Sequence, residues 1–258
     1  MLLLPTARVF RGALLPLALI TAGLAALPSA AQAAEYKVYS PYVVLGESEI
    51  EARTYFNQDD LNAVDGTGAL KLAYGHAFTD FWATEIYAEV EHEEGETEIE
   101  AIEWENRFQL TPQGKYWADV GLLAEAEFAT ESGHSHELKF GPLIEKSFGR
   151  MVATVNLYVE REIGPNAEDE TELGYAARLR YRLNPQFEPS LEIYGSPGEV
   201  GEFAPKGQQR HQIGPGFYGQ VHLSGARKIK YSAAVLYGIT DTGSPNWTYV
   251  VRFEYEFF

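Results

Sequence analysis

The sequence contains no cysteine among its 258 residues. This absence excludes disulfides, thiolate metal sites, iron–sulfur clusters, a cysteine nucleophile and a lipid-anchored N-terminal cysteine. Basic residues are also few, because 20 Lys and Arg stand against 37 Asp and Glu, for a formal net charge of -17. A protein that binds nucleic acid needs a basic face, so we expect no nucleic-acid partner.

Long apolar runs are absent except near the N-terminus. Two arginines precede the apolar run 13–27, and the small-residue pattern Ala-Gln-Ala of residues 31–33 follows it. This order is typical of a secretory signal peptide, and the run is shorter than the roughly 20 residues of a membrane-spanning helix. We therefore predict a signal peptide over residues 1–33, and a single exported domain over residues 34–258.

The rest of the chain alternates between apolar and polar residues with a period of two. Clear examples are residues 84–92, 172–183 and 247–257, where aliphatic and aromatic side chains alternate with charged or small ones. Alternate side chains of a strand point to opposite faces, so each segment has one apolar and one polar face. Using the strand length of membrane barrels as a guide, we expect about twelve strands. They lie near 46–57, 66–77, 81–93, 98–110, 116–129, 136–147, 151–163, 172–183, 188–196, 211–222, 229–238 and 246–258.

The connectors and aromatic residues distinguish two all-β folds that alternation alone does not separate. A soluble β-sandwich would show the same period, but short turns here alternate with longer polar loops, as in an outer-membrane barrel. Aromatic pairs such as Phe81-Trp82 and Tyr116-Trp117 lie at strand ends, where membrane barrels carry aromatic girdles. We predict an all-β fold: a single antiparallel transmembrane β-barrel of about twelve strands, with short periplasmic turns and longer outer loops.

On these features the chain resembles the Gram-negative outer-membrane β-barrel superfamily over residues 35–258. Its last strand is similar to that superfamily's terminal assembly signal, an alternating apolar strand that ends in Phe; here the alternation stops at Phe257, and Phe258 is an extra residue. The resemblance implies a porin-like protein of the cell outer membrane. It also implies contact with outer-membrane lipids and lipopolysaccharide, and assembly by the barrel-assembly machinery through the C-terminal strand.

If the apolar face meets lipid, the polar face lines the lumen. From residue 34 to 145 there are 24 acidic and 6 basic residues, whereas from 146 to 258 there are 13 and 12. Consecutive strands are neighbours in a barrel, so one wall is expected to be acidic and to face an arginine ladder. The residues that we expect to set lumen charge and selectivity are Glu85, Glu89, Glu91, Glu103, Glu105, Glu125, Arg107, Arg178, Arg180, Arg182 and Arg252.

Two functions fit such a lumen. In the first, the protein is a passive channel for small polar or cationic solutes, because excess carboxylates favour cations over anions. In the second, the charged side chains bridge across the lumen and fill it, which leaves a structural or surface barrel. Eight strands are filled by side chains and 16–18 leave a channel, so about twelve strands do not decide between them. We expect no cofactor and no metal in either case.

Two short motifs allow other chemistry. His134 and His136 are residue types that bind metal, but no defined third ligand accompanies them, so we favour a solvated loop. His222-Leu223-Ser224 has the spelling of a His-x-Ser motif of outer-membrane lipid hydrolases, but no orienting acid or oxyanion hole accompanies it. A lipid-modifying enzyme is therefore the less favoured alternative, and we predict that the protein is not an enzyme.

Overall fold

The computed structural model describes residues 36–60, 64–93 and 96–258, without the side chains of residues 91–98. The predicted signal peptide lies outside these residues. In the described part every regular element is a strand, and it contains no helix with the length and apolar character needed to cross a bilayer. The strands are β1 (Ser48–Gln58), β2 (Gly68–Ala77), β3 (Trp82–Glu93), β4 (Glu96–Gln109), β5 (Asp119–Ala129), β6 (His136–Phe148), β7 (Met151–Ile163), β8 (Thr171–Tyr181), β9 (Glu188–Glu199), β10 (Glu202–Phe203), β11 (Arg210–His222), β12 (Lys228–Gly238) and β13 (Trp247–Phe257).

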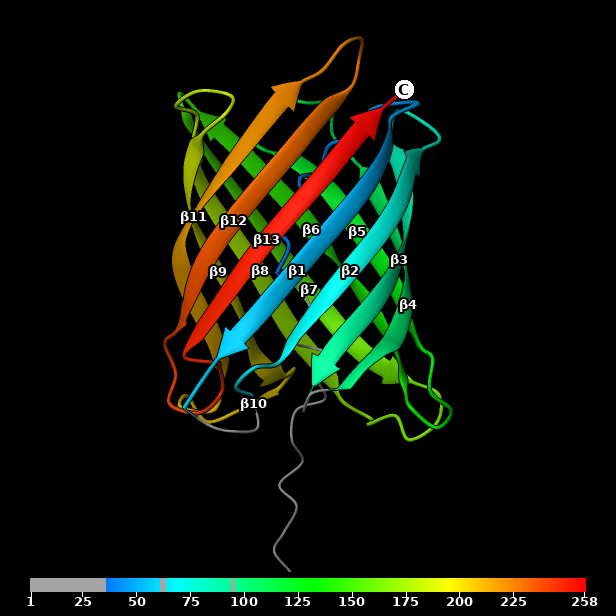
Figure 1. The fold of residues 1–258 in the computed structure, drawn as a ribbon, viewed down its shortest axis with the longest axis vertical. Helices are drawn as coiled ribbons and strands as arrows, with labels where there is room; N and C mark the ends of the chain where they lie inside the picture. Colours follow the sequence, from blue (N-terminus) through cyan, green and yellow to red (C-terminus); the bar gives the residue numbers. More distant parts are fainter. Residues whose placement is uncertain (1–35, 61–63, 94–95) are drawn as a thin grey trace, which may run out of the picture.

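The strands close into one antiparallel barrel (Figure 1). Each long strand pairs with its neighbours in sequence, and β13 pairs with β1 along its whole length, from Ser48 opposite Phe257 to Gln58 opposite Trp247. The strand β10 has two residues and pairs with the end of β9, so the closed barrel itself consists of the other twelve strands. The prediction of a single barrel of about twelve antiparallel strands is confirmed.

The two ends of the barrel differ in their connections. Residues 78–81, 110–118, 149–150, 182–187 and 223–227 join strands at the end where the chain terminates, which we call the short-turn end (Figure 1). The opposite end, the loop end, carries residues 59–67, 130–135, 164–170 and 239–246, and the β9–β10 hairpin. Most strand boundaries differ from the prediction by one to three residues. For example, β5 starts at Asp119, so residues 116–118 belong to a connector, and β9 extends to Glu199.

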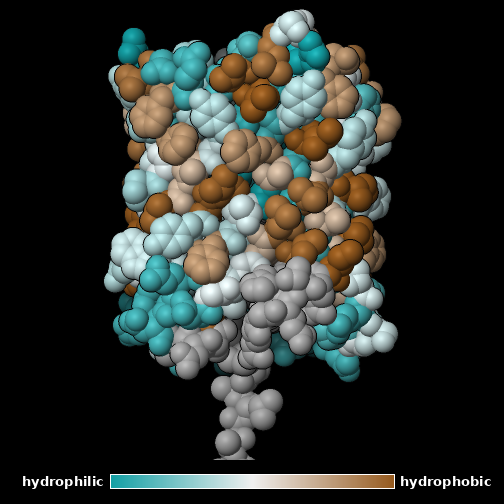
Figure 2. Space-filling model, in the orientation of Figure 1, coloured by the Kyte–Doolittle hydropathy of each residue, from teal (hydrophilic) through white to brown (hydrophobic). Residues whose placement is uncertain are grey.

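The outer face of the cylinder is apolar. On β3, Ile86 is 50% exposed, whereas its neighbours Glu85 and Tyr87 point inward and are buried. The same alternation on β7 exposes Leu157, and on β13 it exposes Phe253. Figure 2 shows hydrophobic side chains across the middle of one face and hydrophilic ones at both ends. A wide apolar band on a closed barrel with a polar interior is suited to hydrocarbon rather than to water.

The variant Leu157→Arg tests this placement. Leu157 lies midway along β7 and is exposed on the outer face. A charge at the midplane of a lipid-facing strand costs about 2–4 kcal/mol, and we expect the free energy of unfolding in phospholipid vesicles to fall by that amount. The control is Val200→Arg, an exposed position beyond the end of β9, for which we expect a change within about 0.5 kcal/mol. Equal losses in the two variants would contradict a lipid-covered outer face.

Candidate functional site: the charged lumen

Five predicted wall residues point into the barrel from three adjacent strands. Glu85 and Glu89 lie on β3, Glu103 and Glu105 on β4, and Glu125 on β5, and all five are buried. Glu85 is opposite Glu105 in the ladder, and Glu105 is opposite Glu125, so the three form one row across the wall. Their inward position follows from the alternation of their strands. The side chain of a further predicted wall residue, Glu91, lies outside the described part.

Space for this row comes from a small neighbour. Gly75 is opposite Glu85 on β2, and a Cβ atom at position 75 would lie 2.5 Å from Cγ of Glu85 and 3.1 Å from Cγ of Glu49. A larger residue on β2 would therefore displace two carboxylates. The wall depends on glycine at this inward position.

Two lysines on the wall each contact three carboxylates. Lys71 Nζ lies 2.6 Å from Glu103, 3.0 Å from Glu89 and 3.6 Å from Glu127. Lys139 Nζ lies 2.9 Å from Glu125, 3.7 Å from Glu137 and 3.9 Å from Glu160. Carboxylates outnumber ammonium groups three to one in both clusters, so the wall stays acidic even though each lysine is paired.

The predicted arginines are dispersed rather than arranged as one ladder against the acidic wall. Arg107 pairs with Glu85 at 3.2 Å within the wall itself. Arg180 pairs with Glu188 at 3.0 Å. The guanidinium of Arg178 stacks on Tyr218, with its central carbon 4.0 Å from the ring centre.

Arg182 and Arg252 occupy contrasting places. The strand β8 ends at Tyr181, so Arg182 belongs to the connector at the short-turn end, where it is exposed and donates to Ser147. The structure thus corrects the expectation that Arg182 lines the lumen. Arg252 is buried and donates to Glu192 at 3.0 Å and to the hydroxyl of Tyr194 at 2.8 Å.

A segment ahead of β1 lies inside the barrel. Residues 36–43, which we call the lumen segment, run from the middle of the cylinder to the short-turn end and are visible behind β1 and β13 in Figure 1. The amide of Tyr39 donates to Oδ1 of Asn156 at 2.7 Å, and Nδ2 of Asn156 donates back to the carbonyl oxygen of Tyr39 at 3.0 Å. The amide of Val43 donates to Gln109 at 2.8 Å. The segment is therefore fixed to the wall in its middle, at Tyr39, and at its end next to β1, at Val43.

The lumen segment also builds an apolar core. Tyr36, Val38 and Tyr39 are buried in one cluster with inward-facing side chains from around the cylinder. The members from the wall are Tyr55, Ala69, Leu123, Leu143, Tyr158, Ala176, Tyr194, Ala234, Leu236 and Val250. The interior therefore has two parts, an apolar core around the segment and an acidic wall beside it.

At the short-turn end, Tyr42 closes the segment against the wall. Its hydroxyl donates to Asp119 at 2.7 Å. Burial, this hydrogen bond and the nearby carboxylate of Glu145 raise the pKa of Tyr42, so the phenol stays protonated and keeps donating.

Lys37 joins the lumen segment to the acidic wall. Its Nζ lies 2.6 Å from Glu51, 3.5 Å from Glu85 and 4.0 Å from Glu105. It also donates to the hydroxyl of Tyr87 at 2.6 Å. The lysine forms a third cluster with three carboxylates, and this one is completed by a residue outside the strands.

Several buried polar atoms of the wall have no hydrogen-bond partner among the described residues. These include Nε, Nη1 and Nη2 of Arg53 and both carboxylate oxygens of Glu105. The nearest acid to Arg53 is Glu51, 3.7 Å from Nε, which is an ion pair without a hydrogen bond. Buried polar groups in proteins are nearly always satisfied by protein, water or ligand. The lumen wall is therefore suited to contact with water or a polar solute.

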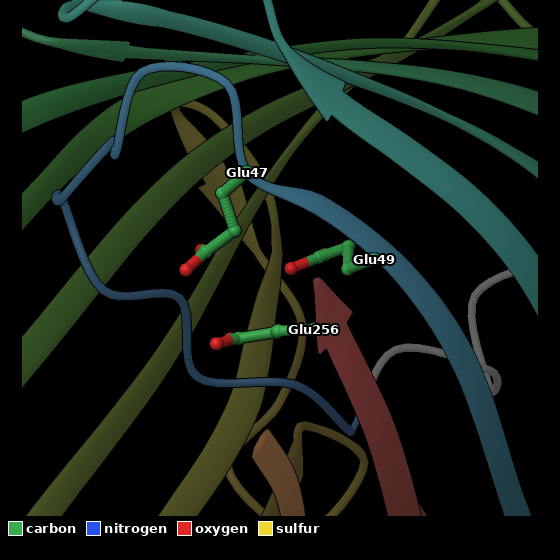
Figure 3. A group of neighbouring side chains, drawn as sticks. All are labelled: Glu47, Glu49 and Glu256. Atoms are coloured by element: carbon green, nitrogen blue, oxygen red, sulfur yellow. The ribbon is translucent and has the colours of Figure 1, made fainter. Parts of the chain in front are cut away.

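A second group of acids lies at the short-turn end. Glu47, Glu49 and Glu256 point toward one another (Figure 3), with one oxygen of each within 4.8 Å of the others. Lys228 pairs with Glu47 at 3.0 Å and also with Glu256, and Lys230 pairs with Glu256 as well. Two lysines of β12 therefore neutralise most of this group.

The two alternative motifs are not assembled into sites in the described residues. The groups of three possible metal ligands found there include neither His134 nor His136, and His134 pairs with exposed Glu131 at 3.5 Å. Ser224 accepts a hydrogen bond from Arg227 at the short-turn end, and both it and His222 are exposed.

Sequence reasoning missed Lys37, Tyr87, Asn156 and Glu192. For Tyr87 and Glu192 a signal was present, because both follow the inward frame of β3 and β9. For Lys37 the signal was its charge, because it is a basic residue between Tyr36 and Tyr39, at the start of the part of the chain that is strongly acidic.

The barrel matches solved structures in fold. The structure of the NanC porin aligns over 81% of this chain and 99% of its own, with a TM-score of 0.54 and 9% sequence identity. The chain has the fold of an outer-membrane β-barrel. A bacterial polysaccharide outer membrane secretin aligns over 83% of this chain and 98% of its own, with a TM-score of 0.41 and 11% identity, a likeness too low to support any inference. No protein-family model and no curated protein matches the sequence of this barrel.

Proposed function

We propose that this barrel is a passive outer-membrane channel for small polar or cationic solutes. The observation that carries the proposal is the acidic wall, with its excess of carboxylates and its buried polar atoms that lack protein partners. Glu105 is the clearest case, because it is 1% exposed and neither of its oxygens accepts a hydrogen bond within the described structure. If an apolar plug filled the lumen, these oxygens would stay buried without a partner, and each unsatisfied polar group would cost about 1–3 kcal/mol.

The charge of the wall supports a preference for cations. The Lys71 and Lys139 clusters retain more carboxylates than ammonium groups. Rings of carboxylates attract cations and repel anions in narrow pores. Arg252 is paired with Glu192, so its charge opposes this preference weakly, whereas Arg178 keeps its charge on the face of Tyr218.

The test is the current through purified protein in a planar bilayer under a KCl gradient. We expect a current whose reversal potential reports preference for K⁺ over Cl⁻. The variant Glu125→Gln is expected to reduce the preference about twofold, because in water two unit charges separated by about 8 Å interact by about 0.5 kcal/mol. The matched control is Glu131→Gln, an exposed loop carboxylate, which should leave the preference unchanged.

The outcomes of this experiment separate the two functions considered for the lumen. Anion preference would contradict the acidic wall as the selective element. No current from folded protein, either unmodified or with the lumen segment released, would reject the channel. The second candidate, a barrel with a filled lumen and a structural or surface role, is favoured by the apolar core around Tyr36 and Tyr39.

The proposed setting of the channel is the cell outer membrane after export by the predicted signal peptide. There the apolar face would contact outer-membrane lipids and lipopolysaccharide, and β13 would serve the barrel-assembly machinery. Cell fractionation tests this setting, because the mature chain should be recovered with outer-membrane rather than inner-membrane markers.

A further inference from the structure

The three lysine clusters of the lumen differ in how the lysine is supplied. Lys71 and Lys139 belong to strands of the wall, whereas Lys37 belongs to the lumen segment. Arg107 and Arg53 of the wall already pair with Glu85 and Glu51, and a further cation for these acids is delivered by a separate stretch of chain. Such an arrangement is expected of a cation-binding site that is occupied by a side chain of the protein itself, here the ammonium group of Lys37.

The groups around Lys37 suit a primary ammonium. Glu51 and the hydroxyl of Tyr87 accept hydrogen bonds from Nζ, both at 2.6 Å, and Glu85 lies 3.5 Å away. The same nitrogen lies 4.7 Å from the ring centre of Tyr39 and 5.2 Å from that of Tyr87. An ammonium has three donors and is attracted to aromatic faces, so it uses both kinds of partner. Carboxylates with aromatic faces recognise alkylammonium ions better than bare divalent ions, which prefer an all-oxygen shell.

Glu105 gives an independent indication. Its carboxylate lies 4.0 Å from Lys37 Nζ and accepts no hydrogen bond in the described structure, although it is almost completely buried. Lysine therefore leaves one acid of its site without a donor. A free ammonium ion, not constrained by the lumen segment, has the freedom to move toward Glu105 and donate to it.

We propose that Glu51, Glu85, Glu105 and Tyr87 form a binding site for the primary ammonium group of a cationic solute, and that Lys37 occupies it as a tethered competitor. The inference deepens the proposed channel function, on which it rests for the route by which the solute arrives. A solute that binds here takes the place of Lys37 and loosens the lumen segment. Binding of the solute therefore favours the form of the protein in which the lumen segment is released and the path through the barrel is open.

The experiment is rescue of Lys37→Ala by n-propylammonium, which supplies the carbon chain and ammonium that the substitution removes. Binding is measured by calorimetry on the purified, detergent-solubilised full chain, with tetramethylammonium at equal ionic strength as the control cation. We expect the variant to bind n-propylammonium about tenfold or more tightly than Lys37→Ala/Glu51→Gln does, the loss typical of one charge-assisted hydrogen bond. Equal affinity in these two proteins, or equal affinity for the two cations, would overturn the proposal.

A second measurement uses the unmodified protein and does not depend on the folding of a variant. The amide of Tyr39 is hydrogen-bonded to Asn156, so its hydrogen exchange reports whether the lumen segment is seated. We expect n-propylammonium to accelerate this exchange and tetramethylammonium to leave it unchanged. Displacing a tethered competitor takes more ligand than filling the emptied site, so the titration extends to concentrations far above those that saturate Lys37→Ala. No acceleration by n-propylammonium over that whole range would also overturn the proposal.

These measurements fail separately from the channel test. Ammonium binding without any bilayer current would support the site and reject the channel. Cation current without ammonium binding to Lys37→Ala would support the channel and reject the site.

Discussion

Lys37→Glu is expected to release the lumen segment and to increase the open time of the channel by roughly 100-fold. The substitution places a fourth carboxylate among Glu51, Glu85 and Glu105, where Nζ now lies within 4.0 Å of all three. Removing one partner of a buried ion pair costs about 3–5 kcal/mol, and the new charge adds repulsion. The bonds between Tyr39 and Asn156 are present in both proteins, so they do not enter the difference between them. A change of about 3 kcal/mol, the lower end of that range, shifts the ratio of released to seated segment by roughly 100-fold.

Single-channel recording of the purified variant checks this expectation. Its matched control is Lys115→Glu, which makes the same charge change at an exposed position of the connector between β4 and β5. The control should behave as the unmodified protein does. Open times in Lys37→Glu no longer than those of the control would show that Lys37 does not hold the segment in place.

Arg252→Ala is expected to lower the free energy of unfolding by about 3–5 kcal/mol, the second-largest effect. Arg252 is the ion-pair partner of Glu192, which is 0% exposed, and it also donates to Tyr194. Truncation leaves the buried carboxylate of Glu192 without its ion pair, and the more distant guanidinium of Arg178, opposite it on β8, offsets only part of its charge. The loss is measured by urea unfolding in phospholipid vesicles, monitored by tryptophan fluorescence.

Two further variants separate the ion pair from a general effect of losing arginine. Arg227→Ala removes an exposed arginine whose side chain bonds to nearby Ser224 in the β11–β12 connector, and we expect a change within about 0.5 kcal/mol. Arg252→Met/Glu192→Gln removes both charges and should recover most of the stability lost in Arg252→Ala. If the double variant were as unstable as the single one, packing rather than charge would explain the loss.

The strands were predictable because every strand of the barrel must place apolar side chains on its outer face and mostly polar ones on its inner face. On β3 the apolar side chains of Ile86 and Ala88 face outward and Glu85 and Glu89 face inward, and this requirement produces a period of two whatever the neighbours are. The inward position of Glu103, Glu105 and Glu125 follows from the same rule. The closed barrel was predicted from short turns that alternate with longer loops, from an even number of strands and from aromatic residues at strand ends.

The lumen segment was not predictable from periodicity. Tyr36, Val38 and Tyr39 are buried by side chains from many strands, so no single surface imposes a repeat on them. Their fit depends on the space that twelve strands leave, which is a property of the closed cylinder. The partners of the arginines also depend on tertiary structure, because Arg178 stacks on Tyr218 from the distant strand β11. Arg182 lies outside the lumen because β8 ends at Tyr181.

The position of the lumen segment also governs how the protein can be labelled. Phe258 is exposed at the short-turn end, so an affinity tag after it would extend from the rim. A tag joined directly to Tyr36 would begin in the middle of the cylinder, among the side chains of Tyr55 and Tyr194. In the folded barrel a bulky group is therefore better accommodated after the last residue than at Tyr36, and a small fluorophore near Tyr36 would report on the interior itself.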